Sequence, residues 1–299
     1  IRTPLVRLGH QPPDADILVK LENLQPIGSF KLRGAANALL LAGRDALADG
    51  VYTASAGNMA QGVAWCAREF GVRCRVVAPD TAPATKLKAI ERLGGEVISV
   101  PFDDWWQTLL DHHRPGVDGV FVHPFADAGV MAGNATIGLE LLEDRADIDA
   151  VLVPWGGGGL ACGIASALRS LRPSTRVYAV EVAGAAPLSA SFAAGQPATI
   201  EPVRSFVDGI GGKSVVPEMW RLAKTLLAGV LTVTVADVAA SVRLLAESNR
   251  VIAEGAGAAA VAAAMNGVPN ARTIACIVSG GNIDTSKLIE ILRDKTSDN

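Results

Sequence analysis

The chain has 299 residues, of which 49% are hydrophobic and 19% are charged, as in ordinary soluble globular proteins. Its net charge of −3 creates no basic field for nucleic acid, and no apolar run reaches membrane-spanning length without Gly, Pro or charge. The sequence opens at Ile1 with residues typical of a domain interior, and no signal peptide is recognisable. We therefore expect a cytoplasmic protein with neither nucleic-acid nor membrane partners.

Short β-branched runs alternate with longer helical patterns along the chain. The runs predict strands at 51–54, 74–78, 97–100, 120–123, 150–153, 177–182, 231–235 and 273–278. The helical patterns predict helices at 58–70, 84–93, 133–143, 160–171, 236–250 and 287–293, with Asp237 as an N-cap and Gly94 at a C′ position. The segment 184–197 is expected to be a surface loop with a short helix. This alternating order predicts an α/β fold with parallel sheets flanked by helices.

The four cysteines are Cys66, Cys74, Cys162 and Cys276. They form no CxxC pair and none lies close to a histidine in the sequence, so we expect neither a zinc site nor a disulfide framework. Buried thiols packed as small apolar side chains are the expected structure.

Lys31 follows the turn sequence Pro-Ile-Gly-Ser-Phe and opens an amphipathic helix. A lysine there opposes the helix dipole, which disfavours a merely solvated residue. An amine near a helix N-terminus and an apolar Phe30 has a lowered pKa and forms Schiff bases readily. The segment alone leaves the structural and the functional interpretations equally open.

Two glycine-containing turns connect predicted strands to predicted helices. In "TASAGNMAQGVAW" (53–65), the backbone N–H groups from Ser55 to Ala60 would form an anion site suited to a carboxylate, or the segment is an ordinary turn capped by an asparagine. In "VLVPWGGGGLACGIA" (151–165), four consecutive glycines would wrap a phosphate. The phosphate could alternatively be part of a nucleotide, because Glu181 ends a later strand, as the ribose-binding carboxylate of a dinucleotide fold does. The glycine spacing, however, differs from the dinucleotide fingerprint.

A fourth segment, "ACIVSGGNID" (275–284), places Ser279 at the end of a buried strand, where its hydroxyl could bond a ring nitrogen. Together the four segments resemble the pyridoxal-phosphate (PLP) enzymes of the tryptophan-synthase-β fold, and most of all the threonine/serine dehydratases and serine racemases. "GSFKLRGA", "SAGNMAQG", "GGGGL" and "SGGN" occur in the order typical of that family. "HPFADAGVMAGNATIGLEL" (123–141) also resembles a segment of these enzymes.

The resemblance implies roles for individual residues. Lys31 would hold the cofactor as a Schiff base and remove the α-proton of the substrate. The cofactor would be bound by Phe30, Lys31, Asn58, Gly156, Gly157, Gly158, Gly159, Leu160, Gly209, Glu254 and Ser279. The carboxylate of an amino-acid substrate would be bound by Ser55, Gly57, Asn58 and Met59.

The resemblance also implies β-elimination, in which a β-hydroxy amino acid is converted to a 2-oxo acid and ammonia. A serine at the ring nitrogen need not keep that nitrogen protonated, which favours prompt loss of the hydroxyl group. The racemases carry a second serine where this chain has Ala56, so we expect little racemisation.

Other departures from the family pattern concern substrate and metal. Met59 replaces the usual histidine, and Asn134 stands where many relatives have glutamine; both leave the substrate open, including bulkier β-hydroxy amino acids or 3-hydroxyaspartate. Glu181 matches a cation ligand of some relatives, but Pro187 lies near the place of the second acid, and we predict no metal. His112 and His113 are expected to be surface residues.

The resemblance predicts two domains with twisted parallel sheets: a large PLP-binding domain of residues 1–49 and 129–299, and a small domain of residues 50–128. It further implies a homodimer or homotetramer. The alternatives are a dehydratase of another 3-hydroxy amino acid, a β-replacement enzyme, a serine racemase, a nucleotide-dependent oxidoreductase and a non-catalytic binding protein.

Overall fold

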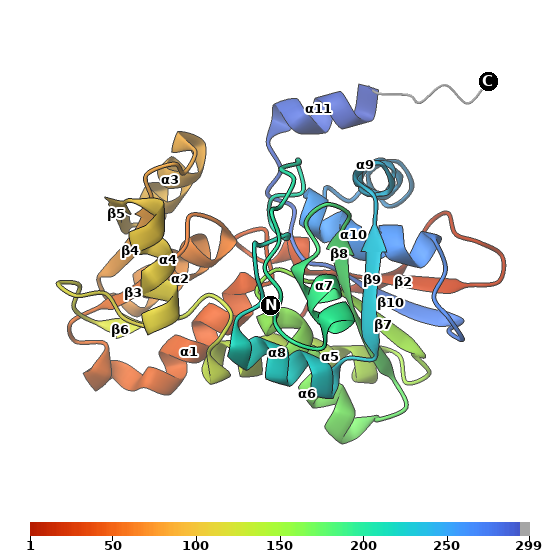
Figure 1. The fold of residues 1–299 in the computed structure, drawn as a ribbon, viewed down its shortest axis with the longest axis horizontal. Helices are drawn as coiled ribbons and strands as arrows, with labels where there is room; N and C mark the ends of the chain where they lie inside the picture. The colour runs from red at the N-terminus through yellow and green to blue at the C-terminus, as the bar shows by residue number, and fades with distance from the viewer. Residues whose placement is uncertain (294–299) are drawn as a thin grey trace. The chain divides into compact units, whose positions relative to one another are not determined.

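The computed structural model describes residues 1–293 of the chain. The contacts between its residues define two compact units, and most of their helices and strands are labelled in Figure 1. Unit 1 combines Ile1–Ser29 with the residues from Ala135 onward, and unit 2 is Phe30–Asn134. Each unit contains one of the two sheets.

Unit 2 is built on a parallel sheet with the strand order β5-β4-β3-β6. Its strands are β3 (Val51–Ala54), β4 (Cys74–Pro79), β5 (Gly95–Val100) and β6 (Val120–Phe121). Its helices are α1 (Lys31–Ala46), α2 (Asn58–Phe70), α3 (Ala84–Arg92), α4 (Phe102–Asp111) and the first part of α5 (Ala128–Asp144). The buried face of α2 contacts β3 and β4, and α1 packs on α2.

Unit 1 is built on a sheet with the order β1-β2-β10-β7-β8-β9. Its strands are β1 (Leu5–Arg7), β2 (Asp16–Leu21), β7 (Ala150–Pro154), β8 (Arg176–Val182), β9 (Gly229–Val233) and β10 (Thr273–Val278). β1 is antiparallel to β2, and the other pairings are parallel. Its helices and helical turns are η1 (Glu22–Leu24), α6 (Gly159–Leu171), α7 (Pro187–Ala194), α8 (Pro217–Leu226), α9 (Val235–Leu244), η2 (Leu245–Asn249), α10 (Gly255–Met265) and α11 (Thr285–Arg293).

The core of unit 1 lies between its central strands and the helices packed on them. Every residue of β7 and β10 is buried, which confirms the prediction made from their uninterrupted apolar sequences. α10 packs against both strands, and its small side chains are almost all buried. Gly257 allows this close approach, because a Cβ at that position would collide with the carbonyl oxygen of Gly280.

Several predicted details differ from the structure. Asp237 is not the N-cap of α9: Thr234 caps the helix, and Asp237 is the third helical residue, whose carboxylate accepts the Thr234 N–H in a capping box. β6 ends at Phe121 rather than 123, and the helix predicted for 236–250 ends at Leu244 and continues as the turn η2. Gly94 follows α3 with a φ of +90°, as expected of a C′ glycine.

The unit boundaries fall at 30 and 134, instead of the predicted 50 and 128. α1, which the prediction places in the large domain, packs on α2 of unit 2. The four cysteines are free and buried, as predicted.

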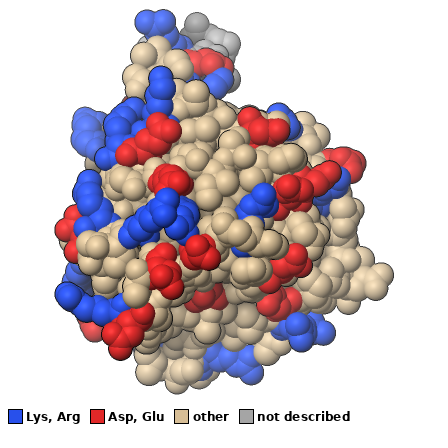
Figure 2. All heavy atoms as spheres, turned by 90° about the vertical axis from the view of Figure 1, so that its left-hand side faces the viewer, with Lys and Arg blue, Asp and Glu red and all other residues tan. Residues whose placement is uncertain are grey.

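Charged side chains of both signs are interspersed on the face shown in Figure 2, in keeping with the small net charge. Across residues 1–293, no helix combines the length and the apolar character needed to cross a membrane.

Candidate active site

Lys31 is the first residue of α1, immediately after the N-cap Phe30. Its Nζ donates a hydrogen bond of 2.6 Å to the carbonyl oxygen of Pro124 and lies 5.1 Å from the centroid of the Phe30 ring. Burial lowers the pKa of Lys31 to about 8, because the charged form loses water. The aromatic ring favours the charged form and opposes this effect. A substantial fraction of the amine is therefore neutral and nucleophilic near physiological pH.

The predicted substrate loop connects β3 to α2. Gly57 is the N-cap of α2 and Asn58 is its first residue, so the loop is not the asparagine-capped turn considered as an alternative. The Gly57 N–H donates to Ser55 Oγ at 3.2 Å, and a Cβ on Gly57 would meet nothing within 4 Å. No side chain among the described residues caps α2, so its first turn keeps backbone donors for an anion. Met59, by contrast, is 2% exposed, and its side chain is buried.

The predicted phosphate loop follows β7 and leads into α6. Gly158 is the N-cap of α6 with a φ of +94°, and within the described chain no side chain caps this helix either. A Cβ on Gly158 would lie 2.7 Å from Cζ2 of Trp155, an indole that is 1% exposed. Glycine is therefore required there both by the backbone conformation and by the neighbouring ring. The resulting turn exposes helix N-terminal N–H groups without a side chain in front of them, as a phosphate site requires.

Three other predicted residues lie close to this loop within unit 1. A Cβ on Gly156 would be 3.2 Å from the carbonyl oxygen of Gly209, and a Cβ on Gly209 would be 3.6 Å from Glu254 Oε1. The N–H of Glu254 donates to the carbonyl oxygen of Gly280 at 3.0 Å, next to the buried Ser279. Unit 1 thus brings together the glycine loop, Gly209, Glu254 and the end of β10.

The predicted site residues are therefore divided between the two units. Unit 2 contains Phe30, Lys31, Ser55, Gly57, Asn58 and Met59. Unit 1 contains Gly156, Gly157, Gly158, Gly159, Leu160, Gly209, Glu254 and Ser279.

Sequence reasoning missed three residues that shape these segments. Trp155 lies beneath the glycine loop, and Pro124 supplies the carbonyl that receives the Lys31 amine. Asn282 donates to the carbonyl oxygen of Ile27 at 2.9 Å, which ties the "SGGN" segment to the turn that precedes Lys31 in sequence. The available signals were the tryptophan before the glycines and the "HPF" and "SGGN" motifs themselves, which do not indicate the hydrogen-bond partners of Pro124 and Asn282.

Glu181 lies at the end of β8 and is fully buried. Its two carboxylate oxygens accept the N–H groups of Leu188 and Ser189 at 2.9 and 2.8 Å, in the first turn of α7, which begins at Pro187. Burial raises the pKa of Glu181 to about 7, and the two backbone hydrogen bonds partly oppose this effect. The carboxylate therefore anchors the start of α7.

Two further features are not part of the predicted cofactor and substrate sites. His112 and His113 are exposed at the end of α4, as expected.

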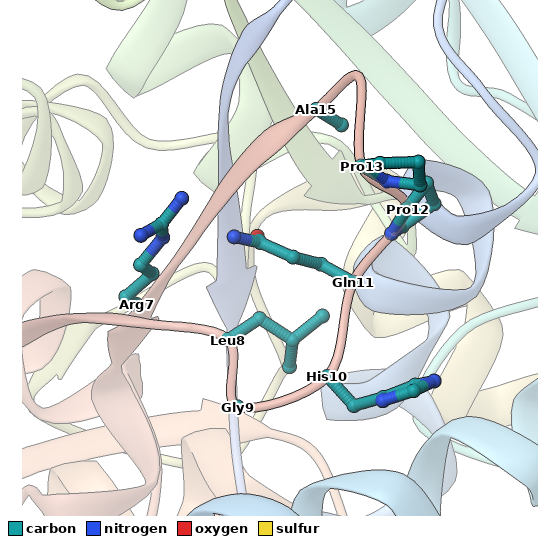
Figure 3. Close-up of a pocket in the computed structure, with 8 residues that line it drawn as sticks. All are labelled: Arg7, Leu8, Gly9, His10, Gln11, Pro12, Pro13 and Ala15. Atoms are coloured by element: carbon teal, nitrogen blue, oxygen red, sulfur yellow. The ribbon is translucent and has the colours of Figure 1, made fainter.

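The pocket in Figure 3 has a volume of about 360 Å³ and is formed by the segment that joins β1 to β2. Because this segment precedes β2, it lies at the amino edge of the parallel strands, whereas the glycine loop follows the carboxyl end of β7. Ligands of parallel sheets bind at the carboxyl edge, so this pocket is not the candidate active site.

The side chains and backbone donors fit PLP: an uncapped helix N-terminus behind a glycine loop for its phosphate, and an amine of lowered pKa for its aldehyde. Enzymes that carry an aldehyde cofactor on a lysine need both of these features. The model of the pyridoxal-phosphate-dependent enzyme family matches residues 1–280, and the chain belongs to this family. Its cofactor is pyridoxal phosphate.

Individual relatives are similar to the chain over most of its length. The chain is 38% identical to an L-threonine ammonia-lyase of Thermotoga maritima over 280 residues, which are 93% of this chain and 70% of that protein. It is also 38% identical to an L-threonine ammonia-lyase of Geobacter sulfurreducens, covering 96% and 73% of the two chains.

Solved structures confirm the predicted fold. The processed form of threonine deaminase isoform 2 from Solanum lycopersicum superposes with a TM-score of 0.86 at 33% identity, covering 97% of this chain and 87% of that one. Maize serine racemase superposes with a TM-score of 0.88 at 29% identity, covering 97% and 91%.

Proposed function

We propose that the protein is a threonine/serine dehydratase, which converts a β-hydroxy amino acid to a 2-oxo acid and ammonia. The observation that carries the proposal is the Lys31 amine at the start of α1, which donates to the Pro124 carbonyl oxygen at 2.6 Å and whose pKa is lowered by burial. The names of the relatives support the reaction type, since several that cover more than nine tenths of this chain are L-threonine ammonia-lyases or dehydratases.

In this proposal Lys31 would hold the cofactor covalently and would accept the α-proton of the substrate at Nζ. When bound, PLP supplies the electron sink for the charge left by that proton. Backbone N–H groups from Gly156 to Leu160 would hold its phosphate, and Phe30, Asn58, Gly209 and Glu254 would contribute to binding its ring. The hydroxyl group of Ser279 would bond the pyridine nitrogen.

The substrate carboxylate is held at the start of α2, by the backbone of Ser55, Gly57, Asn58 and Met59. The absence of a capping side chain on that described helix supports this assignment. Because the Met59 side chain is buried, we assign it a part in shaping the loop, and its backbone the contact with the substrate.

The second candidate function is that of a serine racemase, which the likeness to the maize enzyme favours. Ala56 argues against it, because its methyl group cannot donate a proton to the opposite face of the substrate. We expect the Ala56→Ser variant to form more D-serine than the wild type, relative to the 2-oxo acid. Abundant D-serine from the wild type would instead favour the racemase.

The deciding experiment is the visible spectrum of the purified protein with PLP, before and after borohydride. Wild type and a matched control, Lys213→Ala at an exposed lysine, should show a band that borohydride removes, and both should release a 2-oxo acid from L-threonine or L-serine. Lys31→Ala should lack the band and the activity. A band that persists in Lys31→Ala would refute the lysine assignment. A wild-type band without 2-oxo acid from any β-hydroxy amino acid would refute the dehydratase assignment alone.

We further infer from the same family resemblance that the chain forms a homodimer or homotetramer in the cytoplasm. Light scattering on the purified chain tests the assembly, and cell fractionation tests the location.

A further inference from the structure

The carbonyl group that receives the Lys31 amine belongs to a turn that is fixed by a buried histidine. Lys31 Nζ donates to the Pro124 oxygen at 2.6 Å. His123 is 2% exposed, and its Nδ1 accepts the N–H of Phe125 at 3.2 Å and that of Ala126 at 2.8 Å. Since both partners are backbone donors, Nδ1 carries no proton and the ring is neutral.

The same peptide group connects the two interactions. The carbonyl oxygen bonded by Lys31 and the N–H bonded by His123 both belong to the peptide that joins Pro124 to Phe125. A trans peptide is planar, and its C=O and N–H point in opposite directions. Holding the N–H on His123 therefore directs the carbonyl oxygen away from the imidazole and toward the lysine.

The imidazole itself is held on several sides. It stacks on His112 with ring centroids 4.4 Å apart, and its edge-on contacts are with Phe121 at 5.9 Å and Phe125 at 4.5 Å. The preceding residue, Val122, is anchored to β3, since its carbonyl oxygen accepts the Thr53 hydroxyl at 2.7 Å. Burial, and then the nearby His112, lower the pKa of His123 to about 3. The ring thus remains a neutral acceptor throughout the physiological range.

We propose that His123 is a positioning residue, which orients the Pro124 carbonyl so that it holds the Lys31 amine whenever that amine is not bonded to the cofactor. This inference rests on the proposed role of Lys31. A dehydratase must release the lysine from the cofactor in each turnover and then use it as a base. A fixed acceptor at 2.6 Å limits the positions that the released amine can take.

A pair of substitutions separates the acceptor from the ring. In His123→Asn, Oδ1 occupies the place of Nδ1 along the side chain and still accepts the backbone N–H groups. In His123→Phe, the ring shape remains and the acceptor is lost. We expect His123→Phe to lower kcat roughly ten- to a hundredfold with KM nearly unchanged, and His123→Asn to keep kcat within roughly threefold of wild type.

A second readout does not depend on turnover. The full chain, stripped of PLP, is mixed with PLP at a series of pH values, and the growth of the visible band gives the midpoint at which the Lys31 amine loses its proton. Because an ammonium group is stabilised by a carbonyl acceptor, losing that contact lowers the midpoint. We expect a decrease of roughly one pH unit in His123→Phe and no shift in His123→Asn.

Thermal unfolding of each variant identifies a merely structural loss. If His123→Phe does not fold, His123→Gln takes its place in the comparison. The glutamine side chain is one carbon longer than that of asparagine, so its acceptor oxygen is displaced from the position of Nδ1. The proposal would be overturned if His123→Asn and the Phe (or Gln) variant had equal kcat values and equal midpoints. It would also be overturned if a folded His123→Asn variant had a kcat as low as that of the Phe (or Gln) variant. If wild type itself shows no band that Lys31→Ala removes, the proposed function fails first, and independently of His123.

Discussion

Replacing Gly158 by alanine should destabilise unit 1 much more than an alanine at another left-handed glycine. Gly158 has a φ of +94°, and a Cβ there would lie 2.7 and 2.8 Å from Cζ2 and Cζ3 of the buried Trp155. The left-handed backbone costs an alanine about 1–2 kcal/mol, and displacing a packed ring adds about 1–3 kcal/mol. Gly195 is the matched control, since its φ is +69° and its Cβ would meet nothing within 4 Å. Gly195→Ala should therefore show only the backbone cost.

The assay is thermal unfolding of wild type and both variants at one protein concentration, with and without PLP. For domains of this size class, a loss of 1 kcal/mol lowers the midpoint by roughly 2–4 °C. We expect Gly158→Ala to unfold several degrees below Gly195→Ala and to bind PLP more weakly, because a displaced indole distorts the start of α6. Equal midpoints for the two variants would refute the steric argument, and equal PLP affinities would refute its link to the cofactor.

Three other outcomes follow from the structure. With a Lys31 pKa of about 8, the rate of PLP capture by stripped enzyme should rise as pH increases toward 8 and level off above it; continued growth toward pH 10 would contradict the lowered pKa. For Glu181, the folded pKa of about 7 lies above the unfolded value of 4.5, so folding retains a proton between these values. The contribution of Glu181 to the free energy of unfolding is complete below pH 4.5 and decreases by up to about 3 kcal/mol as pH rises to 7. Urea unfolding measured at each pH should show a weaker pH dependence in Glu181→Gln than in wild type. Finally, Thr234→Ala should cost about 1 kcal/mol by removing the cap of α9, whereas Thr234→Ser should cost much less; equal losses measured by urea unfolding would contradict the capping role.

The sequence predicted best those elements whose hydrophobic pattern has one interpretation. β3, β10 and α2 have the predicted bounds because their apolar runs are bounded by turn residues on both sides. α10 was missed because "GAGAAAVAAAM" is apolar on all sides, so no amphipathic period indicated a helix, although its many alanines favour one. Its helical state is stabilised by tertiary contacts with β7, β10 and α9, which a local pattern does not contain.

Within the candidate site, motifs predicted the segments better than the partners of each side chain. The glycine run predicted a close backbone approach, and Gly158 meets that requirement. The ring that imposes it belongs to Trp155, whose orientation could not be predicted from the pattern of residues. The carbonyl oxygen that accepts the Lys31 hydrogen bond could not be predicted either. Every residue has a backbone carbonyl, so the side-chain pattern does not identify it, and Pro124 lies 93 positions from Lys31 in the sequence.

The two candidate anion sites, one in each unit, have the same local structure: a helix that begins directly after a glycine. α2 begins after Gly57 and α6 begins after Gly158, and no described side chain caps either helix. Glycine at an N-cap costs only a few tenths of a kcal/mol relative to serine or asparagine, yet it leaves the first N–H groups without an internal acceptor. A bound anion can then complete the helix that a side chain would otherwise cap. The positive φ of Gly158 adds a steric requirement that Gly57 lacks, so substitution should perturb folding at α6 and chiefly ligand access at α2.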